Sequence, residues 1–183
     1  PVMRVPQFIS ETGYTGLGMK IGVLSDSVNV NGSLTNAIAS GDLPANVEVL
    51  YDAPAGADEG TAMLEIIYDV APGASLAFNS ASPGPQGFAD GIQALSAAGC
   101  QVIVDDIVYL NQPVYNEGVV NLSVTDVVEN QGRFYASAAG NDADNGWRGT
   151  WSTISGTIGG ISGNFMSFGG LPYQEVGIPT NDG

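Results

Sequence analysis

Residues 58–78 read DEGTAMLEIIYDVAPGASLAF and decide the fold. Asp58 is a good helix N-cap, and the apolar stripe that follows it at helical spacing predicts a helix over residues 58–70. A Pro-Gly pair at residues 72–73 stops that helix. The apolar run at residues 74–78 then predicts a short buried strand. A helix followed at once by a buried strand is the repeating unit of an α/β fold.

The rest of the chain alternates in the same way between short apolar runs and helical patterns. The runs are apolar on both faces, as parallel strands are when helices cover them. The sequence therefore predicts an α/β fold with a three-layer doubly wound parallel sheet. Residues 1–18 carry closely spaced glycines and predict turns. The predicted strands are residues 19–24, 47–51, 74–78, 101–109 and 133–138, and the other predicted helices are residues 33–40 (with Ser33 as N-cap), 88–98 and 119–129.

The composition changes after residue 146. Residues 147–183 are rich in Gly, Ser, Thr and aromatic residues and show no helical period. They predict short antiparallel strands in the segments WSTISGTI, SFGG and YQEVGI. We therefore expect an α/β core over residues 1–146 and a β-rich extension of the same domain over residues 147–183.

Charge and composition exclude several classes of protein. The chain has 4 Lys and Arg against 19 Asp and Glu, a formal net charge of −15, and no His. So few cations cannot build a nucleic-acid surface, and they disfavour binding to an anionic membrane surface. No apolar run approaches the length of a membrane span. Without His, no Ser-His or Cys-His pair can form within the chain, and Cys100 alone cannot form an internal disulfide. The acidic, Gly-rich balance favours a secreted or cell-surface protein of a microbe.

Polar residues stand where the predicted strands end. They are Asp26, Asp105, Asp106 and Asn141. In an open parallel sheet, ligands bind beyond the carboxyl ends of the strands, so we expect the site there. Asp105 and Asp106 are adjacent and point to opposite faces of a strand, so at most one of them can face the cleft.

Four segments, in matching order, resemble the subtilase superfamily. They are GYTGLGMKIGVLSDS (13–27), DEGTAMLEIIYDVAPGASL (58–76), CQVIVDDIVY (100–109) and SAAGNDADNG (137–146), of which the VAPGA and AAGN runs are the most specific. The resemblance implies a subtilisin-like fold and serine peptidase activity on peptide or protein substrates. It also makes a calcium ion possible, although Asp142, Asp144 and Asn145 lack the spacing of a calcium loop. No cofactor is identifiable.

The resemblance also implies the catalytic residues. Glu59 stands where subtilases have the catalytic histidine, and sedolisins, the serine-carboxyl branch, use a Glu there as general base. The chain is therefore identified as similar to that branch, and its enzyme would work best at acidic pH. Asp26 matches the aspartate that ends the first strand, although the strict register could place Ser25 in that position. Asn141 matches the asparagine of the oxyanion hole.

Two further features bear on this assignment. The third segment lines the substrate groove in the resemblance, so Asp105 or Asp106 is expected to contact substrate. Met63 stands where sedolisins carry an Asp on the same helix as the Glu. Glu65 lies about 240° around the helix from Glu59 and faces away, which leaves Asp26 as the expected partner.

The main departure from the subtilase pattern is that the motif of the nucleophilic serine is missing. No Gly-Thr-Ser motif follows Asn141, and Gly156-Thr157 is followed by Ile158. We therefore expect the N-terminal part of an extracellular serine endopeptidase that ends before the catalytic serine and is inactive alone. Its partner would be the remainder of the peptidase chain. The alternative is a catalytically inactive structural or binding module, such as a self-assembling surface or filament subunit that forms homo-oligomers.

Each candidate residue also has a plainer interpretation. An acid at the position of Glu59 is also typical of the first turn of a helix, where its negative charge complements the helix dipole. Asp26 is also a common way to end a strand, and Asn141 is a common left-handed turn residue.

Overall fold

Five strands form the parallel sheet of the first part of the chain, in the order β2-β3-β1-β4-β5. Their bounds are β1 (Lys20–Ser25), β2 (Glu48–Tyr51), β3 (Ser75–Ser80), β4 (Val102–Asp105) and β5 (Phe134–Ser137). Every pairing is parallel, and β1 lies in the centre between β3 and β4. In this computed structural model the described residues are 3–110, 112–113, 116–141 and 150–171. They divide into two compact units, Pro1–Ala139 and Gly140–Gly183.

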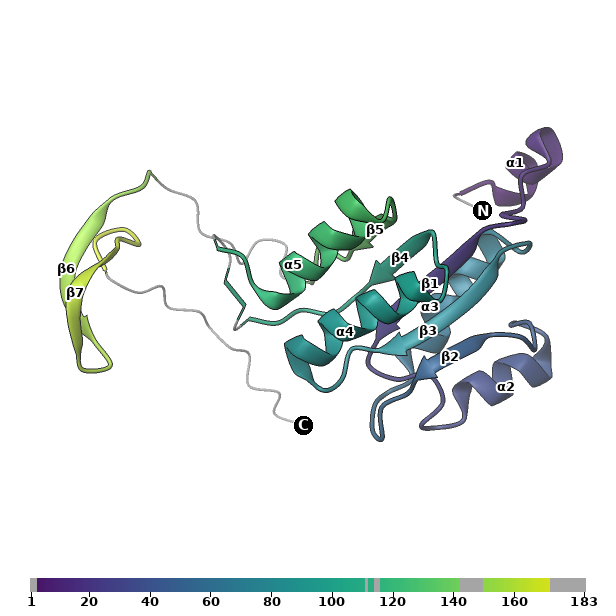
Figure 1. The fold of residues 1–183 in the computed structure, drawn as a ribbon, viewed down its shortest axis with the longest axis horizontal. Helices are drawn as coiled ribbons and strands as arrows, with labels where there is room; N and C mark the ends of the chain where they lie inside the picture. Colours follow the sequence, from purple (N-terminus) through teal and green to yellow (C-terminus); the bar gives the residue numbers. More distant parts are fainter. Residues whose placement is uncertain (1–2, 111, 114–115, 142–149, 172–183) are drawn as a thin grey trace. The chain divides into compact units, whose positions relative to one another are not determined.

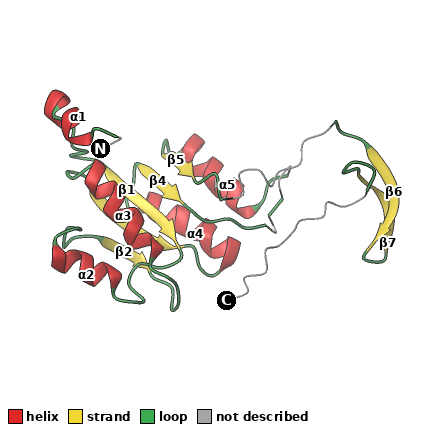
Figure 2. Cartoon of the chain, turned by 180° about the vertical axis from the view of Figure 1, so that it is seen from behind, coloured by secondary structure: helices red, strands yellow, loops and turns green. Residues whose placement is uncertain are grey.

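Helices cover both faces of this sheet (Figures 1 and 2). These helices are α2 (Ser33–Ser40), α3 (Glu59–Val70), α4 (Gly84–Ala97) and α5 (Val119–Thr125), and α5 continues into a π-helical turn, η1 (Asp126–Asn130). A further helix, α1 (Val5–Thr12), precedes the sheet and buries none of its residues. Alternate residues of β1 point to opposite faces. Val23 packs with buried residues of α2 and α3, while Leu24 packs with those of α4 and η1. The three-layer α/β sheet predicted from the sequence is confirmed.

The second unit contains an antiparallel hairpin. Its strands are β6 (Thr153–Ile158) and β7 (Ile161–Met166), and Phe168 pairs with Leu171 in an isolated bridge. The β-rich extension predicted from the sequence is therefore confirmed. The expected strand YQEVGI lies outside the described residues.

Several local predictions are wrong. The glycine spacing in residues 1–18 predicted turns, but α1 forms there, because Pro6 fits the first turn of a helix and Gly13 ends it with a left-handed φ of 74°. The helix predicted over residues 88–98 begins four residues earlier, since α4 starts at Gly84.

One of the two predicted N-caps is wrong, and the other, Asp58, holds the cap position of α3 without capping it through its side chain. Gly32, not Ser33, occupies the cap position of α2, with a φ of 81°. Asp58 precedes α3 with a φ of 61°, and its side chain makes no capping hydrogen bond. Its carboxylate is used elsewhere, as described below. Among the described residues, no helix is both long and apolar enough to cross a membrane.

Candidate functional site

The carboxyl ends of β1 and β4 lie next to each other at the same end of the sheet. Leu24 pairs with Asp105 in the parallel register, so the residues that follow, Ser25 and Asp106, lie side by side at the ends of the two strands. The Ser25 hydroxyl donates a hydrogen bond to Asp106 Oδ2 at 3.1 Å. Two of the acids predicted from the sequence, Asp26 and Asp106, therefore lie on either side of one buried serine.

Asp26 holds the segment that leads into α3. Its Oδ1 accepts a hydrogen bond from the Glu59 backbone N–H at 3.0 Å, and its Oδ2 accepts one from the Ala57 backbone N–H. The Ser27 backbone N–H also donates to Oδ1. The carboxylate of Asp26 thus fixes the backbone from which the Glu59 side chain projects.

The carboxylate of Asp58 holds the segment that follows Asp26. Asp58 is only 4% exposed, and its carboxylate accepts hydrogen bonds from the Ser27 hydroxyl and from the backbone N–H groups of Val30 and Asn31, at 2.7 to 2.8 Å. The Ser33 backbone N–H adds a longer bond at 3.3 Å. Burial by itself raises the pKa of Asp58, but these hydrogen bonds outweigh it and hold the pKa below its usual value. Sequence reasoning missed this role because an acid before a helix indicates an N-cap first.

Gly60 explains why α3 begins so close to the end of β1. A Cβ at this position would lie 2.3 Å from Cε2 of Phe78 and 2.7 Å from the Ser27 carbonyl oxygen. The Gly60 backbone N–H donates to that same carbonyl at 3.1 Å. The absence of a side chain therefore lets the first turn of α3 press against β3 and the β1 loop, with Glu59 exposed just before it.

Asp105 is bound to β5 rather than to open solvent. It is 5% exposed, its Oδ2 accepts a hydrogen bond from the Tyr135 hydroxyl at 2.7 Å, and its Oδ1 accepts one from the Ser137 hydroxyl at 2.9 Å. Burial and then the negative charge of Asp105 raise the pKa of Tyr135, which keeps that phenol neutral. The side chain of Asp105 joins two neighbouring strands.

Asp106 directly follows β4 at the carboxyl end of that strand. Its side chain is partly buried, and its Oδ1 is buried without a hydrogen-bond partner among the described residues. Burial raises the pKa of Asp106, the Ser25 hydroxyl opposes that shift, and the nearby charges of Glu59 and Asp105 add to it. The two adjacent aspartates therefore have different surroundings, as their alternation on a strand predicts.

Asn141 is exposed and belongs to the second unit. Asp26 and Glu59 belong to the first unit, so the oxyanion role of Asn141 stays a prediction. The structure brings Asp26, Glu59 and Asp106 together within the first unit.

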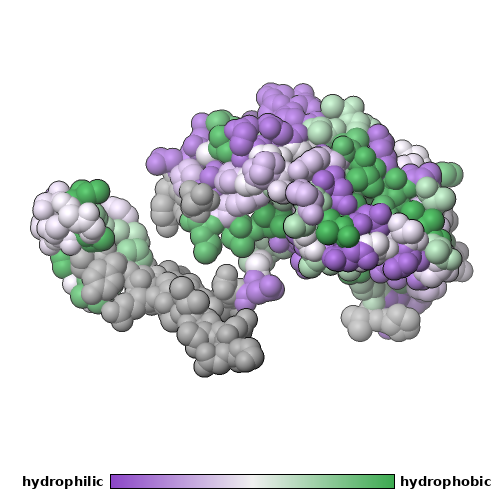
Figure 3. Space-filling model, turned by 90° about the horizontal axis from the view of Figure 1, so that it is seen from below, coloured by the Kyte–Doolittle hydropathy of each residue, from purple (hydrophilic) through white to green (hydrophobic). Residues whose placement is uncertain are grey.

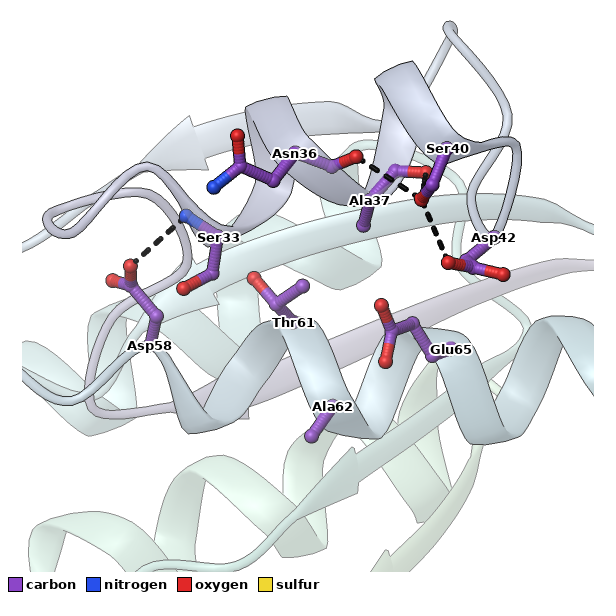
Figure 4. Close-up of a pocket in the computed structure, with 9 residues that line it drawn as sticks. All are labelled: Ser33, Asn36, Ala37, Ser40, Asp42, Asp58, Thr61, Ala62 and Glu65. Atoms are coloured by element: carbon purple, nitrogen blue, oxygen red, sulfur yellow. Dashed lines mark hydrogen bonds between the residues drawn. The ribbon is translucent and has the colours of Figure 1, made fainter.

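A separate groove lies between α2 and α3, with a volume of about 470 Å³. Figure 4 shows Asp58 at one end of it and Asp42 and Glu65 toward the other, with Thr61 between them. Glu65 lines this groove and Glu59 does not, which agrees with their predicted separation around the helix. Within the described ranges, no group of three acidic or cysteine side chains is placed to hold a metal ion.

The comparisons with known proteins concern the fold. No family model matches the chain, and no curated protein matches it. Among solved structures, the prenylagaramide maturation protease PagA superposes with a TM-score of 0.54 at 16% identity, over 75% of this chain and 51% of that one. MycP1 with its N-terminal propeptide removed superposes with a TM-score of 0.54 at 17% identity, over 76% of this chain and 47% of that one. This chain spans about half the length of either structure.

These findings correct the assignment made from the sequence motifs. The similar structures are subtilisin-like peptidases, and no family model supports membership in the sedolisin-like branch, so that assignment is wrong. The substitution of Glu for His at one position was too little to identify a branch. What the comparisons support is a fold of the subtilisin-like peptidase type.

Proposed function

We propose that this chain supplies the base side of an extracellular serine-type endopeptidase. Glu59 is the general base, in the place of the usual histidine, Asp26 is the partner that fixes it, and Asn141 donates to the oxyanion. The substrate is a peptide or protein bound as an extended strand beside Asp106, since Asp105 is buried against β5. The protein is secreted or held at the cell surface.

One observation carries this proposal. The Asp26 carboxylate accepts a hydrogen bond from the Glu59 backbone N–H, so an acid at the end of the central strand fixes the first residue of α3. General bases need such fixed geometry, because a misplacement of about 1 Å costs about 100-fold in rate. The subtilisin-like fold of the similar structures supports a base and partner at these positions.

The nucleophilic serine comes from outside these 183 residues, and the chain alone is inactive. Two observations support this part of the proposal. No Gly-Thr-Ser motif follows Asn141, and the chain spans about half the length of the similar structures. Because a carboxylate accepts protons best near its own pKa, the complete enzyme works fastest at acidic pH.

The test uses the protein isolated from its natural source. Its intact mass is measured first, and a mass well above 18.7 kDa is expected. The protein is then treated with a serine-reactive phosphonate and assayed on a peptide mixture between acidic and neutral pH. We expect labelling and cleavage with an acidic optimum.

Glu59→Gln in the same full-length protein should lower the cleavage rate by about 100-fold or more, because general-base catalysis contributes that much. Glu65→Gln, on the same helix but in the groove between α2 and α3, is the matched control and should retain full activity. Equal losses in the two variants would contradict the role of Glu59, and an optimum above neutrality would contradict carboxylate catalysis.

A second candidate is a non-enzymatic module that assembles with copies of itself. The specific observation is the open sheet: β2 and β5 are its edges, and Phe134 on β5 is 64% exposed. Figure 3 shows apolar side chains gathered on one face of the first unit. Exposed edges of this kind pair readily with other strands. No phosphonate labelling, together with a mass by light scattering that rises with concentration, would favour this candidate.

A further inference from the structure

The β6–β7 hairpin of the second unit (Figure 1) has a polar face and an apolar face. Residues paired across the two strands lie on the same face, and successive pairs alternate between the faces. On the polar face Ser155 lies opposite Asn164, and Thr157 lies opposite Ser162. A side-chain hydrogen bond joins each pair, at 2.7 Å and 2.8 Å. These polar side chains therefore find partners within the hairpin.

The apolar face is partly open to solvent. Its cross-strand pairs, from the open end of the hairpin to the turn, are Ile154–Phe165, Gly156–Gly163 and Ile158–Ile161. Ile161 is 70% exposed, Ile158 is 36% exposed, and a Cβ at Gly163 would have open space around it. A two-stranded hairpin without a covering layer is at best marginally stable in water. The apolar face is therefore where a partner would add most to the stability of the hairpin.

The distribution of charge indicates what covers this face. The chain carries a net charge of −15, so copies of it repel one another. Residues 149–174, which include the hairpin, contain no Asp, Glu, Lys or Arg and are the longest uncharged run in the sequence. Two copies can therefore meet here with the least repulsion, whereas a cationic partner would bind the acidic side chains elsewhere. Natural edge strands often carry charges that prevent pairing, and β6 and β7 carry none.

The apolar face also complements itself in size. Bulky pairs lie at both of its ends, and the pair Gly156–Gly163 leaves a gap between them. Two hairpins can stack face to face in opposite directions, offset by two residues. Each copy then places its Ile158–Ile161 pair over the glycine pair of the other copy. The offset is the same for both copies, so one surface of the chain supplies both halves of a symmetric contact.

We propose that this chain forms a dimer in which the apolar faces of two β6–β7 hairpins stack about a twofold axis. Such a contact uses the same surface on both copies and closes at two chains. Strands of this length span about 20 Å and lie about 5 Å apart, so the stacked area is below that of a standard interface and the dimer is weak. The dimer does not involve Glu59 or Asp26 and stands whether or not the chain belongs to a peptidase.

The test measures the mass of the 183-residue chain in solution. Sedimentation velocity is recorded from micromolar to millimolar concentration, because a small interface gives a weak dimer. We expect the mass to rise with concentration from 18.7 kDa toward twice that value. Added salt should lower the dissociation constant, because it screens the repulsion between two acidic chains. A mass that stays at 18.7 kDa throughout, or a dimer that salt dissociates, would overturn the proposal.

Variants locate the contact. Ile158→Thr combined with Ile161→Thr removes apolar surface but keeps β-branched side chains, which suit strands, and should raise the dissociation constant about 10-fold or more. Ile66→Thr makes the same change at a 63% exposed position of α3 and should leave the dissociation constant unchanged. Phe134→Thr, on the edge strand β5, should also leave it unchanged. Circular dichroism shows that each variant is folded. A hairpin variant that dimerises as the wild type does, or an equal loss in Phe134→Thr, would contradict this interface.

Discussion

Asp26 and Asp58 hold each other's backbone segments. The carboxylate of Asp26 accepts hydrogen bonds from the backbone of Ala57 and Glu59, on either side of Asp58. The carboxylate of Asp58 accepts hydrogen bonds from the backbone of residues 30 and 31, in the loop that follows Asp26, and from Ser33 at the start of α2. We call this pair of interactions the reciprocal clamp. It joins the end of the central strand to the start of α3, where the candidate site lies.

Asp58→Asn tests the clamp. An amide nitrogen cannot accept the backbone N–H bonds that one carboxylate oxygen accepts now, so at least one partly buried donor among Val30, Asn31 and Ser33 loses its partner. We expect the free energy of unfolding to fall by about 2 kcal/mol. Urea unfolding at neutral pH measures it. Asp42→Asn is the control, because the exposed Asp42 accepts a side-chain bond from Ser40, and its effect should stay within about 0.5 kcal/mol.

The clamp also predicts an acid dependence of stability. The pKa of Asp58 is lowered in the folded chain, so the unfolded chain binds a proton first as the pH falls below 3.8. The stability that the ionised Asp58 contributes is thus present above 3.8 and is lost as the pH falls through the folded pKa. Unfolding curves recorded at several acidic pH values should show a shallower loss in Asp58→Asn than in the wild type. Parallel losses in both would argue against the shifted pKa.

Gly60→Ala should destabilise the first unit without changing any charge. The added Cβ would lie 2.3 Å from the ring of Phe78, which is fully buried and cannot move freely. Overpacking of this kind costs about 1–3 kcal/mol. Thermal unfolding measures the loss. Gly163→Ala is the control, because a Cβ there has open space around it, and a similar drop in both variants would show that the cause is not the contact with Phe78.

Tyr135 should limit stability at alkaline pH. Burial and the charge of Asp105 raise its pKa in the folded chain, so the unfolded chain loses this proton first as the pH rises past 10. The folded state is therefore favoured below pH 10 and loses that advantage above it. Tyr135→Phe should be less stable than the wild type at neutral pH, by about 1–2 kcal/mol, since Asp105 loses a donor. Its stability should then fall less between neutral and alkaline pH. Tyr14→Phe, at a 73% exposed position, should behave as the wild type does.

Cys100 should resist thiol reagents in the folded chain. Its side chain is fully buried, and burial raises the pKa of the thiol to about 11. The reactive thiolate is then scarce at pH 8, and reagent has no access to the sulfur. We expect slow labelling in buffer and rapid labelling in denaturing urea, followed by mass spectrometry. Equally rapid labelling under both conditions would contradict the burial of this residue.

The sequence was sufficient to predict the layers of the fold, because short apolar runs and helical stripes follow from local periodicity. The helix of residues 58–70 and the strand after it lie close to where they were predicted. The whole of α1 was missed, because Gly13, Gly16 and Gly18 dominate the local pattern although Pro6 fits a first helical turn.

The site was predictable only in part. The carboxyl ends of parallel strands must meet at one edge, so the sequence alone was enough to place Asp26 and Asp106 near each other. The tasks of the acids could not be foreseen. The Asp58 carboxylate accepts hydrogen bonds from residues that lie 25 to 31 positions earlier in the chain, and no local sequence pattern predicts such a contact. The bond between Asp105 and Tyr135 likewise depends on the pairing of β4 with β5.

The reciprocal clamp has a consequence for the order of folding. Its hydrogen bonds join positions about 30 residues apart, so the intervening chain must close a large loop before any of them can form. Such non-local contacts are made late, after local helices and turns. If the clamp forms after the transition state, its loss should speed unfolding more than it slows refolding.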